Sequence, residues 1–413
     1  MRLGALSCTA VLSLALAQAT CSNITPVGPD AGGTEIGAGL CPGPIAADPH
    51  VAERLACAFP AGARASATSG FDDTARAALP IRHVIVVMKE NRSFDHIFGA
   101  LAATQPEADT FPTGFTNPDP HGNPVAPYHL NTTCIQNDPG HQWQAMHDQV
   151  DGGTMDGYAR VAGAFTETDG WFALGYYDAH DLPFYYWLAS TFAIADRYFP
   201  SVRSGTFPNR DYLLLGTSDK VQSTGTTIWP DPSLPIIFER LDAAGVSWGV
   251  YADPGDEPFE GCLDDPNHVW KGQHGYKTTT TLFTELAAGT VPSVVFVDAR
   301  EGTADEHPPS DVQVGEAWTQ RLYTAVAASP AWSTTALLFT YDEAGGFFDH
   351  VPPPDDACLA RPADLVPGER RLLGGRIGGV HRAVNRRACN TGHARAPWPP
   401  HRDGRERAAR RLP

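Results

Sequence analysis

The stretch PSLPIIFERLDAAGVSWGVYAD, residues 232–253, predicts a helix that stops near Gly245 and a strand that follows it. The same order recurs twice further along the chain, in TLFTELAAG with PSVVFVDA (281–289, 292–299) and in VGEAWTQRLYTAVAAS with TTALLFTYDE (314–329, 334–343). Helices and strands that alternate in this way are typical of a mainly parallel sheet with helices on both faces. The predicted fold class is therefore α/β, with a mainly parallel sheet sandwiched by helices.

Acidic residues stand where the predicted strands end. The apolar run IRHVIVVM, residues 81–88, is a further candidate core strand. The acids that close the four strands are Glu90, Asp253, Asp298 and the pair Asp342–Glu343. Ligands of parallel α/β sheets bind just outside the carboxyl ends of the strands. A single acid after a strand is most often a turn or helix cap, and we expect this structural capping role for Asp253 and Asp298.

Two pairs of adjacent oxygen-bearing side chains are harder to explain as caps. Glu90 is followed by Asn91, and Asp342 is followed by Glu343. Carboxylate and amide oxygens without a thiolate suit a hard or borderline divalent ion. We therefore expect both pairs to meet at one edge of the sheet and to bind one metal ion. The alternative is that Glu90 and Asp95 only cap or pair locally in a helix that begins at Ser93.

The segment SVRSGTFPNRDYLLLGTS, residues 201–218, presents a hydroxyl beside a cation. Thr206 lies in a turn led by glycine, and Arg210 follows four residues later. A hydroxyl is a weak nucleophile until a metal or a base activates it, and the expected ion could do so. Ser204 is the nearest competitor for this role. By itself the motif is weak, because most segments of this kind are turns.

Four histidines occur in loops near acidic residues: His141, His147, His307 and His350. Such a histidine could donate a proton to a leaving group or a hydrogen bond to phosphoryl oxygens. Any single one of them is more often structural.

The N-terminus has the pattern of an export signal. Residues 1–19 contain one Arg, a short apolar run and the triplet Ala17-Gln18-Ala19, which predict cleavage after Ala19 and a secreted or periplasmic protein. A lipoprotein anchored through Cys21 is the less favoured alternative. Nothing further along is apolar enough for an integral membrane segment. Export would allow disulfide bonds among six cysteines: Cys21, Cys41, Cys57, Cys134, Cys262 and Cys358.

The remaining organisation follows from composition. Residues 20–80 have no sustained period and are expected to form an irregular N-terminal extension. Residues 359–413 are rich in Arg, contain no Lys and have no helical or strand period, which favours an out-of-frame or disordered tail over a basic patch for anionic surfaces. The formal net charge of -17 argues against nucleic acid as a partner, because phosphate backbones are bound by positive surfaces.

A family resemblance emerges when the motifs are taken in order. The motifs are ENRSFDH followed by FG, DPGHQW with GGTMDGY, YYDAHDLPFYYWLASTFAIADRYFPS, T-F-PNR, DEHPP and TYDEAGGFFDHVPPP. From about His83 to Pro354 they resemble the bacterial phosphoesterase family of phospholipases C and acid phosphatase A. The resemblance implies an alkaline-phosphatase-like core over residues 81–358, with an insertion at about 100–230 that has helices and many loops.

The resemblance also implies a mechanism. Thr206 would be the nucleophile that takes the phosphoryl group, and water would later release it. The implied metal ligands are Glu90, Asn91, Thr206, Asp342 and Glu343. The implied groups around the phosphate and the leaving group are His141, His307 and His350, with Arg210 as a nearby cation.

The predicted function is a secreted, metal-dependent phosphoric ester hydrolase with one divalent ion. Its substrate is expected to be a phosphodiester such as a phospholipid, as for phospholipase C, or a phosphomonoester, as for acid phosphatase. The alternative is a truncated, catalytically impaired family member that binds metal or phosphate at the cell surface.

Overall fold

The computed structural model describes residues 73–219, 221–222, 224, 234–256, 258–259 and 276–353, together with short pieces between residues 49 and 68. The expected signal peptide, most of the N-terminal extension and the tail at 359–413 lie outside the described residues. Of the six cysteines expected to pair, only Cys134 is described, and it is buried. The predictions of export and of disulfide bonds therefore remain predictions.

The centre of the molecule is a five-stranded sheet in which every neighbouring pair of strands is parallel. In spatial order the strands are β7 (Tyr276–Thr278), β6 (Trp248–Ala252), β8 (Val294–Asp298), β1 (His83–Lys89) and β9 (Thr335–Tyr341). This sheet confirms the predicted α/β class. The sequence analysis did not predict β7, which has only three residues and stands at one edge.

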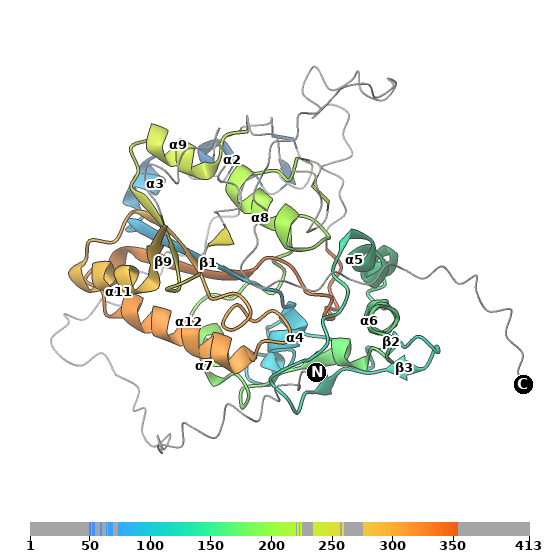
Figure 1. Cartoon of the computed structure of the whole chain (residues 1–413). Coiled ribbons are helices and arrows are strands. Elements are labelled where there is room, and N and C mark those ends of the chain that lie inside the picture. Colours follow the sequence, from blue (N-terminus) through green and yellow to red (C-terminus); the bar gives the residue numbers. More distant parts are fainter. Residues whose placement is uncertain are drawn as a thin grey trace, which may run out of the picture.

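Helices cover both faces of this sheet, as Figure 1 shows. The pair α11 (Thr279–Ala288) and α12 (Val312–Ala327) packs on one face, and α8 (Thr206–Leu215) with α9 (Ile237–Ala243) packs on the other. The first face buries Ile85, Val87, Val295, Leu282, Leu286, Trp318 and Leu322 together. The second buries Leu214, Phe238, Trp248, Val250 and Phe296. Each such side chain contributes about 1.5–3 kcal/mol by leaving water, so the sheet is fixed from both sides.

Helix boundaries follow the predicted signals. The helix α9 is followed by Gly245 at φ 66°, and α11 ends at Gly289 with φ 68°, a left-handed conformation that glycine adopts without strain. At the other end of α11, the Thr278 hydroxyl accepts a hydrogen bond from the Thr281 N–H. Such capping side chains satisfy N–H groups that the helix leaves unpaired.

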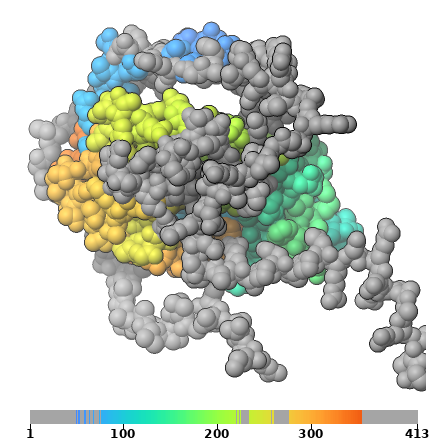
Figure 2. Space-filling view, turned by 45° about the horizontal axis from the view of Figure 1, so that its top comes forward, coloured from blue at the N-terminus to red at the C-terminus, as the bar shows by residue number. Residues whose placement is uncertain are grey.

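Most of the region expected as an insertion lies beside the central sheet, but its last helix, α8, packs on a face of that sheet. Its longer helices are α5 (Trp143–Val150), α6 (Tyr158–Thr166) and α7 (Pro183–Thr191). Figure 2 shows this green part of the chain as one flank of the molecule, beside the yellow and orange segments. The aromatic residues Phe184, Tyr185 and Tyr186 of α7 are buried.

Short elements complete the described chain. They are α2 (Ala65–Thr68), α3 (Asp73–Ala78), α4 (Phe94–Phe98), the two-residue strands β2 (Asn117–Pro118), β3 (Pro124–Val125), β4 (Tyr128–His129) and β5 (Gly175–Tyr176), and the 3-10 turns η2 (Leu101–Ala103), η3 (Asp151–Gly153), η4 (Trp171–Leu174) and η6 (Trp332–Thr334). Among the described helices, none combines the length and the apolar character that crossing a membrane requires.

Candidate active site

The two predicted pairs of oxygen ligands leave the sheet side by side. Strands β1 and β9 are adjacent and parallel, with Lys89 opposite Tyr341 in the register. The Asp342 N–H then donates to the Lys89 carbonyl at 3.0 Å. The side chains that follow each strand therefore emerge at the same edge of the sheet. Just beyond them, Ser93 caps α4 by accepting from the His96 N–H, so the helix start expected at Ser93 is confirmed.

Three of these four side chains are buried with unpaired polar atoms. Asn91 is 0%, Asp342 1% and Glu343 2% exposed. Within the described part of the chain, Asn91 Oδ1 and Nδ2, Asp342 Oδ2 and Glu343 Oε1 have no hydrogen-bond partner. A buried polar atom without a partner costs about 1–3 kcal/mol. Unpaired buried oxygens of this kind suit a divalent metal ion, although Glu90, Asp342 and Glu343 are not among the described groups of three His, Cys, Asp or Glu whose ligand atoms all lie within 4.8 Å of one another.

Burial raises the pKa of three acids at this site, Asp342, Glu343 and Asp305. Burial, with the neighbouring charges of Glu90 and Glu343, raises the pKa of Asp342 well above its usual range, although Arg210 opposes this shift. Burial also raises the pKa of Glu343. The pKa of Asp305 rises to about 7, first through burial and then through Glu90. A bound cation would favour the ionised form of each carboxylate.

Thr206 lies at the first turn of α8, directly beside this cluster. The residue is buried, and its hydroxyl lies close enough to the Asp342 carboxylate to lower the pKa of that acid. The competing hydroxyl of Ser204 instead donates to the Gln222 carbonyl. Gly205 is needed between them, because a Cβ there would lie 2.8 Å from the Thr224 hydroxyl and 3.4 Å from a His141 ring carbon. The helix start therefore presents Thr206, and not Ser204, to the acids.

Arg210 joins three strand ends from the next turn of α8. Its Nη1 lies 3.3 Å from Asp298 Oδ1, its Nη2 3.4 Å from Glu90 Oε1, and its Nε 3.8 Å from Asp342 Oδ2. From the sequence, this cation was expected beside the Thr206 hydroxyl as a catalytic candidate, and in the structure it also lies among carboxylates at the ends of β1, β8 and β9.

The two single acids expected to be caps behave differently from each other. Asp298 contacts Arg210 at 3.3 Å and accepts from the Phe259 N–H at 2.7 Å, so the expectation of a simple turn cap was wrong for this residue. Asp253 accepts from the Thr279 hydroxyl at 2.7 Å and from the Trp318 indole N–H at 3.0 Å. Its carboxylate ties β6 to α11 and α12 through two side chains, which is a structural role but not the turn or helix cap that was expected.

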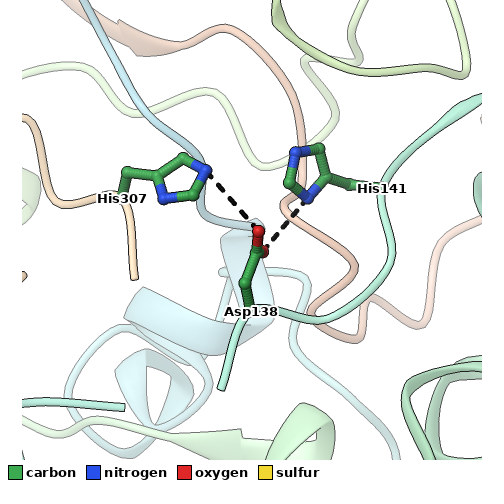
Figure 3. Close-up of side chains that lie close together, drawn as sticks. All are labelled: Asp138, His141 and His307. Atoms are coloured by element: carbon green, nitrogen blue, oxygen red, sulfur yellow. Dashed lines mark ion pairs between the residues drawn. The ribbon is translucent and has the colours of Figure 1, made fainter. Parts of the chain in front are cut away.

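Two of the predicted histidines lie together around Asp138, as Figure 3 shows. His141 Nδ1 is 3.2 Å from Asp138 Oδ1, and His307 Nε2 is 3.8 Å from Asp138 Oδ2. On its other side, His141 Nε2 faces Glu343 Oε1 at 4.0 Å. Burial would lower the pKa of His141, but the charges of Glu343 and Asp138 outweigh it and raise this pKa to about 10. Sequence analysis missed Asp138, although it stands in the DPGH motif three residues before His141.

The other two histidines are engaged elsewhere. His350 Nδ1 lies 2.7 Å from Asp95 Oδ2, and its Nε2 lies 3.0 Å from Asp109 Oδ1. With both ring nitrogens facing carboxylates, His350 has no nitrogen left for a phosphate, contrary to the role that the resemblance implied. His147 makes no described hydrogen bond to the site residues. Its Nδ1 lies 2.7 Å from the Trp143 carbonyl within α5.

Two glycines after Glu343 allow the motif segments to touch. Gly345 and Gly346 have φ 64° and 75°, in the left-handed region. A Cβ on Gly345 would collide with the Asn91 carbonyl, and one on Gly346 would lie 2.6 Å from the Gly140 carbonyl. Because real Cβ atoms do not approach so closely, this Gly-Gly turn is what allows β9, the candidate ligand Asn91 and the His141 loop to lie together.

A buried ion pair supports the loop that carries His307. Glu306 is 0% exposed, with φ 77°, and its carboxylate pairs with Lys89 and accepts from the hydroxyls of Tyr185 and Tyr341. The backbone carbonyl of Glu306 accepts from Arg92 Nε at 2.9 Å. These contacts fix the backbone between Asp305 and His307, which lie on either side of Glu306. Sequence reasoning gave no role to either partner of this pair.

Comparison with known proteins agrees with these motifs. The model of the Phosphoesterase family matches residues 81–378, which is most of the chain and extends 20 residues past the domain end expected at residue 358. "Phospholipase C B" of Mycobacterium tuberculosis is 33% identical over 339 residues, covering 70% of this chain and 62% of that protein. "Non-specific phospholipase C1" of Arabidopsis thaliana is 33% identical, covering 67% of this chain and 54% of that protein.

A third relative, "Non-hemolytic phospholipase C" of Pseudomonas aeruginosa, is also 33% identical, over 69% of this chain and 45% of that protein. The chain thus spans roughly half to two thirds of the length of these relatives. The family match covers the central sheet, the strand-end ligands, Thr206 and both histidines beside Asp138. This chain belongs to the Phosphoesterase family.

Proposed function

We propose that this chain is a metal-dependent phosphoric ester hydrolase in which Thr206 is the nucleophile. One observation carries the proposal. The Thr206 hydroxyl contacts Asp342 in a cluster where Asn91, Asp342 and Glu343 all have buried polar atoms without hydrogen-bond partners. A hydroxyl presented to such a cluster is placed for nucleophilic attack on a phosphoryl group held beside it.

The proposed ligands of the metal are the four strand-end residues and the nucleophile: Glu90, Asn91, Asp342, Glu343 and Thr206. Their donor atoms are all oxygens, with one amide, which suits a hard or borderline divalent cation. When bound, such an ion would supply positive charge to the hydroxyl and to the oxygens of the phosphoryl group.

The chain's own residues then have separate tasks. The Thr206 oxygen attacks phosphorus as its proton passes to the adjacent Asp342 carboxylate, which returns the proton to Thr206 when water releases the phosphoryl group. His141 and His307 provide N–H groups for the phosphoryl oxygens and a proton for the departing alcohol. Water then attacks the phosphothreonine, releases phosphate or a phosphate ester, and restores Thr206. His350 is not part of this set, since both its nitrogens are bound by carboxylates.

The substrate we propose is a choline or related phospholipid, cleaved on the glycerol side of the phosphate. The support comes from the relatives, which carry the name phospholipase C. The export signal expected at residues 1–19 would agree with an enzyme that meets lipids outside the cytoplasm.

The test is an assay of the purified full chain with each of several divalent ions. Its substrates are a choline phospholipid and an aryl phosphate monoester. Hydrolysis of the phospholipid, abolished by a chelator, supports the proposal. Hydrolysis of the monoester alone would make the chain a phosphatase instead. A protein that binds metal yet cleaves neither substrate would reject the enzyme and favour the binding protein considered above.

A further inference from the structure

Asp138 occupies a singular position in the candidate site. Its carboxylate lies between two imidazole rings, with Oδ1 3.2 Å from His141 Nδ1 and Oδ2 3.8 Å from His307 Nε2 (Figure 3). The two rings approach each other at 5.6 Å between centroids, nearly at right angles. One carboxylate therefore lies beside both histidines that take part in the proposed reaction.

Backbone carbonyls fix which nitrogen of each ring carries a hydrogen. His141 Nδ1 is 3.1 Å from the Pro139 carbonyl, and His307 Nδ1 is 2.7 Å from the Pro308 carbonyl. A carbonyl oxygen can only accept, so both Nδ1 atoms are donors. His141 consequently presents Nε2 to Glu343 and the metal cluster. His307 Nε2, at 3.8 Å from Asp138, is beyond hydrogen-bond distance of the carboxylate and stays open to a phosphoryl oxygen.

The same hydrogens argue against a second metal ion at this place. Asp138, His141 and His307 offer ligand atoms within 4.8 Å of one another, as a metal site would. However, the His141 nitrogen nearest to Asp138 is Nδ1, which the Pro139 carbonyl commits to donating. A donating N–H cannot bind a metal, so the contact between His141 and Asp138 is one of orientation and charge.

We infer that Asp138 is a positioning residue, which holds His141 and His307 in the orientation that they need beside the phosphoryl group. The inference rests on the proposed function. Asp138 touches neither the proposed metal ligands nor Thr206 in any described contact; it acts only through the two rings. As the bond from phosphorus to the departing oxygen breaks, that oxygen takes a proton from an imidazolium of this pair, which becomes neutral imidazole.

A comparison of two leaving groups distinguishes a positioning role of Asp138 from a purely structural one. A diacylglycerol alkoxide is a poor leaving group and needs a proton, whereas p-nitrophenolate departs readily without one. The substrates are therefore short-chain phosphatidylcholine and p-nitrophenyl phosphocholine, which share one head group. We expect Asp138→Asn to lower kcat about 100-fold for the lipid, the cost of a misplaced group, and only a few-fold for the p-nitrophenyl ester. The metal content and KM should change little.

The control is Asp148→Asn, because Asp148 is an exposed acid on α5 whose side chain, among the described residues, bonds only Gln144. It should match the wild type with both substrates. Thermal unfolding of each variant shows whether Asp138→Asn is folded, and Asp138→Glu, which keeps the charge, should recover part of the lipid activity.

Three results would overturn the inference while leaving the proposed function intact. They are unchanged lipid hydrolysis, an equal loss with both substrates, and the loss of one metal ion per chain in Asp138→Asn. The last would show a second metal site instead. A wild-type protein inactive on both esters would reject the proposed function, and the inference would fail with it.

Discussion

The guanidinium of Arg210 lies 3.4 Å from the carboxylate of Glu90, and the same cation also reaches Asp298 and Asp342. Arg210 is only 5% exposed. It is thus a fixed positive charge beside Asp342, whose pKa burial raises well above its usual range. When no metal is bound, its positive charge offsets the repulsion among the three carboxylates at the ends of β1, β8 and β9.

Arg210→Ala should therefore lower the free energy of unfolding by about 3–5 kcal/mol in the presence of a chelator, because it leaves buried carboxylates without their partner. Urea unfolding measures this loss. The control is Arg160→Ala, which breaks an exposed pair with Asp151 and should cost about 0–1 kcal/mol. Equal losses in the two variants would contradict the role assigned to Arg210.

Glu90→Gln tests the metal site. The change keeps the shape of the side chain and removes its charge, so metal bound per chain should fall. The matched control is Asp298→Asn, because Asp298 also pairs with Arg210 but is not a proposed ligand. Elemental analysis after dialysis compares the two. A full metal content in Glu90→Gln would remove Glu90 from the ligands.

The fold could be predicted because its signals are local. Each long strand is a short apolar run that ends at an acid, and α11 stops at the glycine that its sequence indicates. The two ligand pairs were likewise predictable, since adjacent polar residues directly after a buried strand are unusual. The strand β7 gave no such signal, because three residues of mixed polarity at an edge show no period.

Other parts of the site depend on contacts between distant residues. His350 meets Asp95 across 255 positions, and Lys89 meets Glu306 across 217. No spacing in the sequence indicates which acid a histidine or lysine will find in space. For this reason the sequence placed His350 at the phosphate, and it also left Asp138 without a role.

Thr206→Ala should abolish hydrolysis, with a loss of about 1,000-fold or more, since the nucleophile itself is removed. Thr206→Ser keeps the hydroxyl and should retain much of the activity. Ser204→Ala serves as the second control, because the Ser204 hydroxyl is committed to the Gln222 carbonyl and should not affect kcat. The measurement is kcat at saturating metal. Unchanged turnover in Thr206→Ala would reject the nucleophile.

Gly346→Ala should both destabilise the protein and impair catalysis. At φ 75°, a Cβ would be strained and would press on the Gly140 carbonyl, next to His141. We expect a loss of about 2–5 kcal/mol in the free energy of unfolding. Gly216 has φ 76° with nothing within 4 Å of a Cβ, so Gly216→Ala should cost about 1–2 kcal/mol and keep full activity. Similar losses would mean that the contact with Gly140 is unimportant.

His350 should make stability fall in alkaline solution. Its hydrogen bonds to Asp95 and Asp109 outweigh burial and raise its pKa to about 9. Because this pKa is above the value of about 6.5 in the unfolded chain, the stabilisation is complete below pH 6.5. It is lost as the pH rises through about 9. Burial raises the pKa of the neighbouring Asp349 to about 7, so this carboxyl titrates mostly below the pH of about 9 at which His350 loses its proton.

The measurement is the difference in free energy of unfolding between the wild type and His350→Gln at several pH values. Glutamine can still hydrogen-bond but cannot carry the charge that attracts the two carboxylates. The difference should be largest at or below pH 6.5 and should shrink steadily between pH 7 and 10, since deprotonation removes that charge from the wild type as well. Titration of the metal-site acids affects both proteins equally and cancels. A difference that stayed constant over this range would show that His350 acts through its shape and not through its proton.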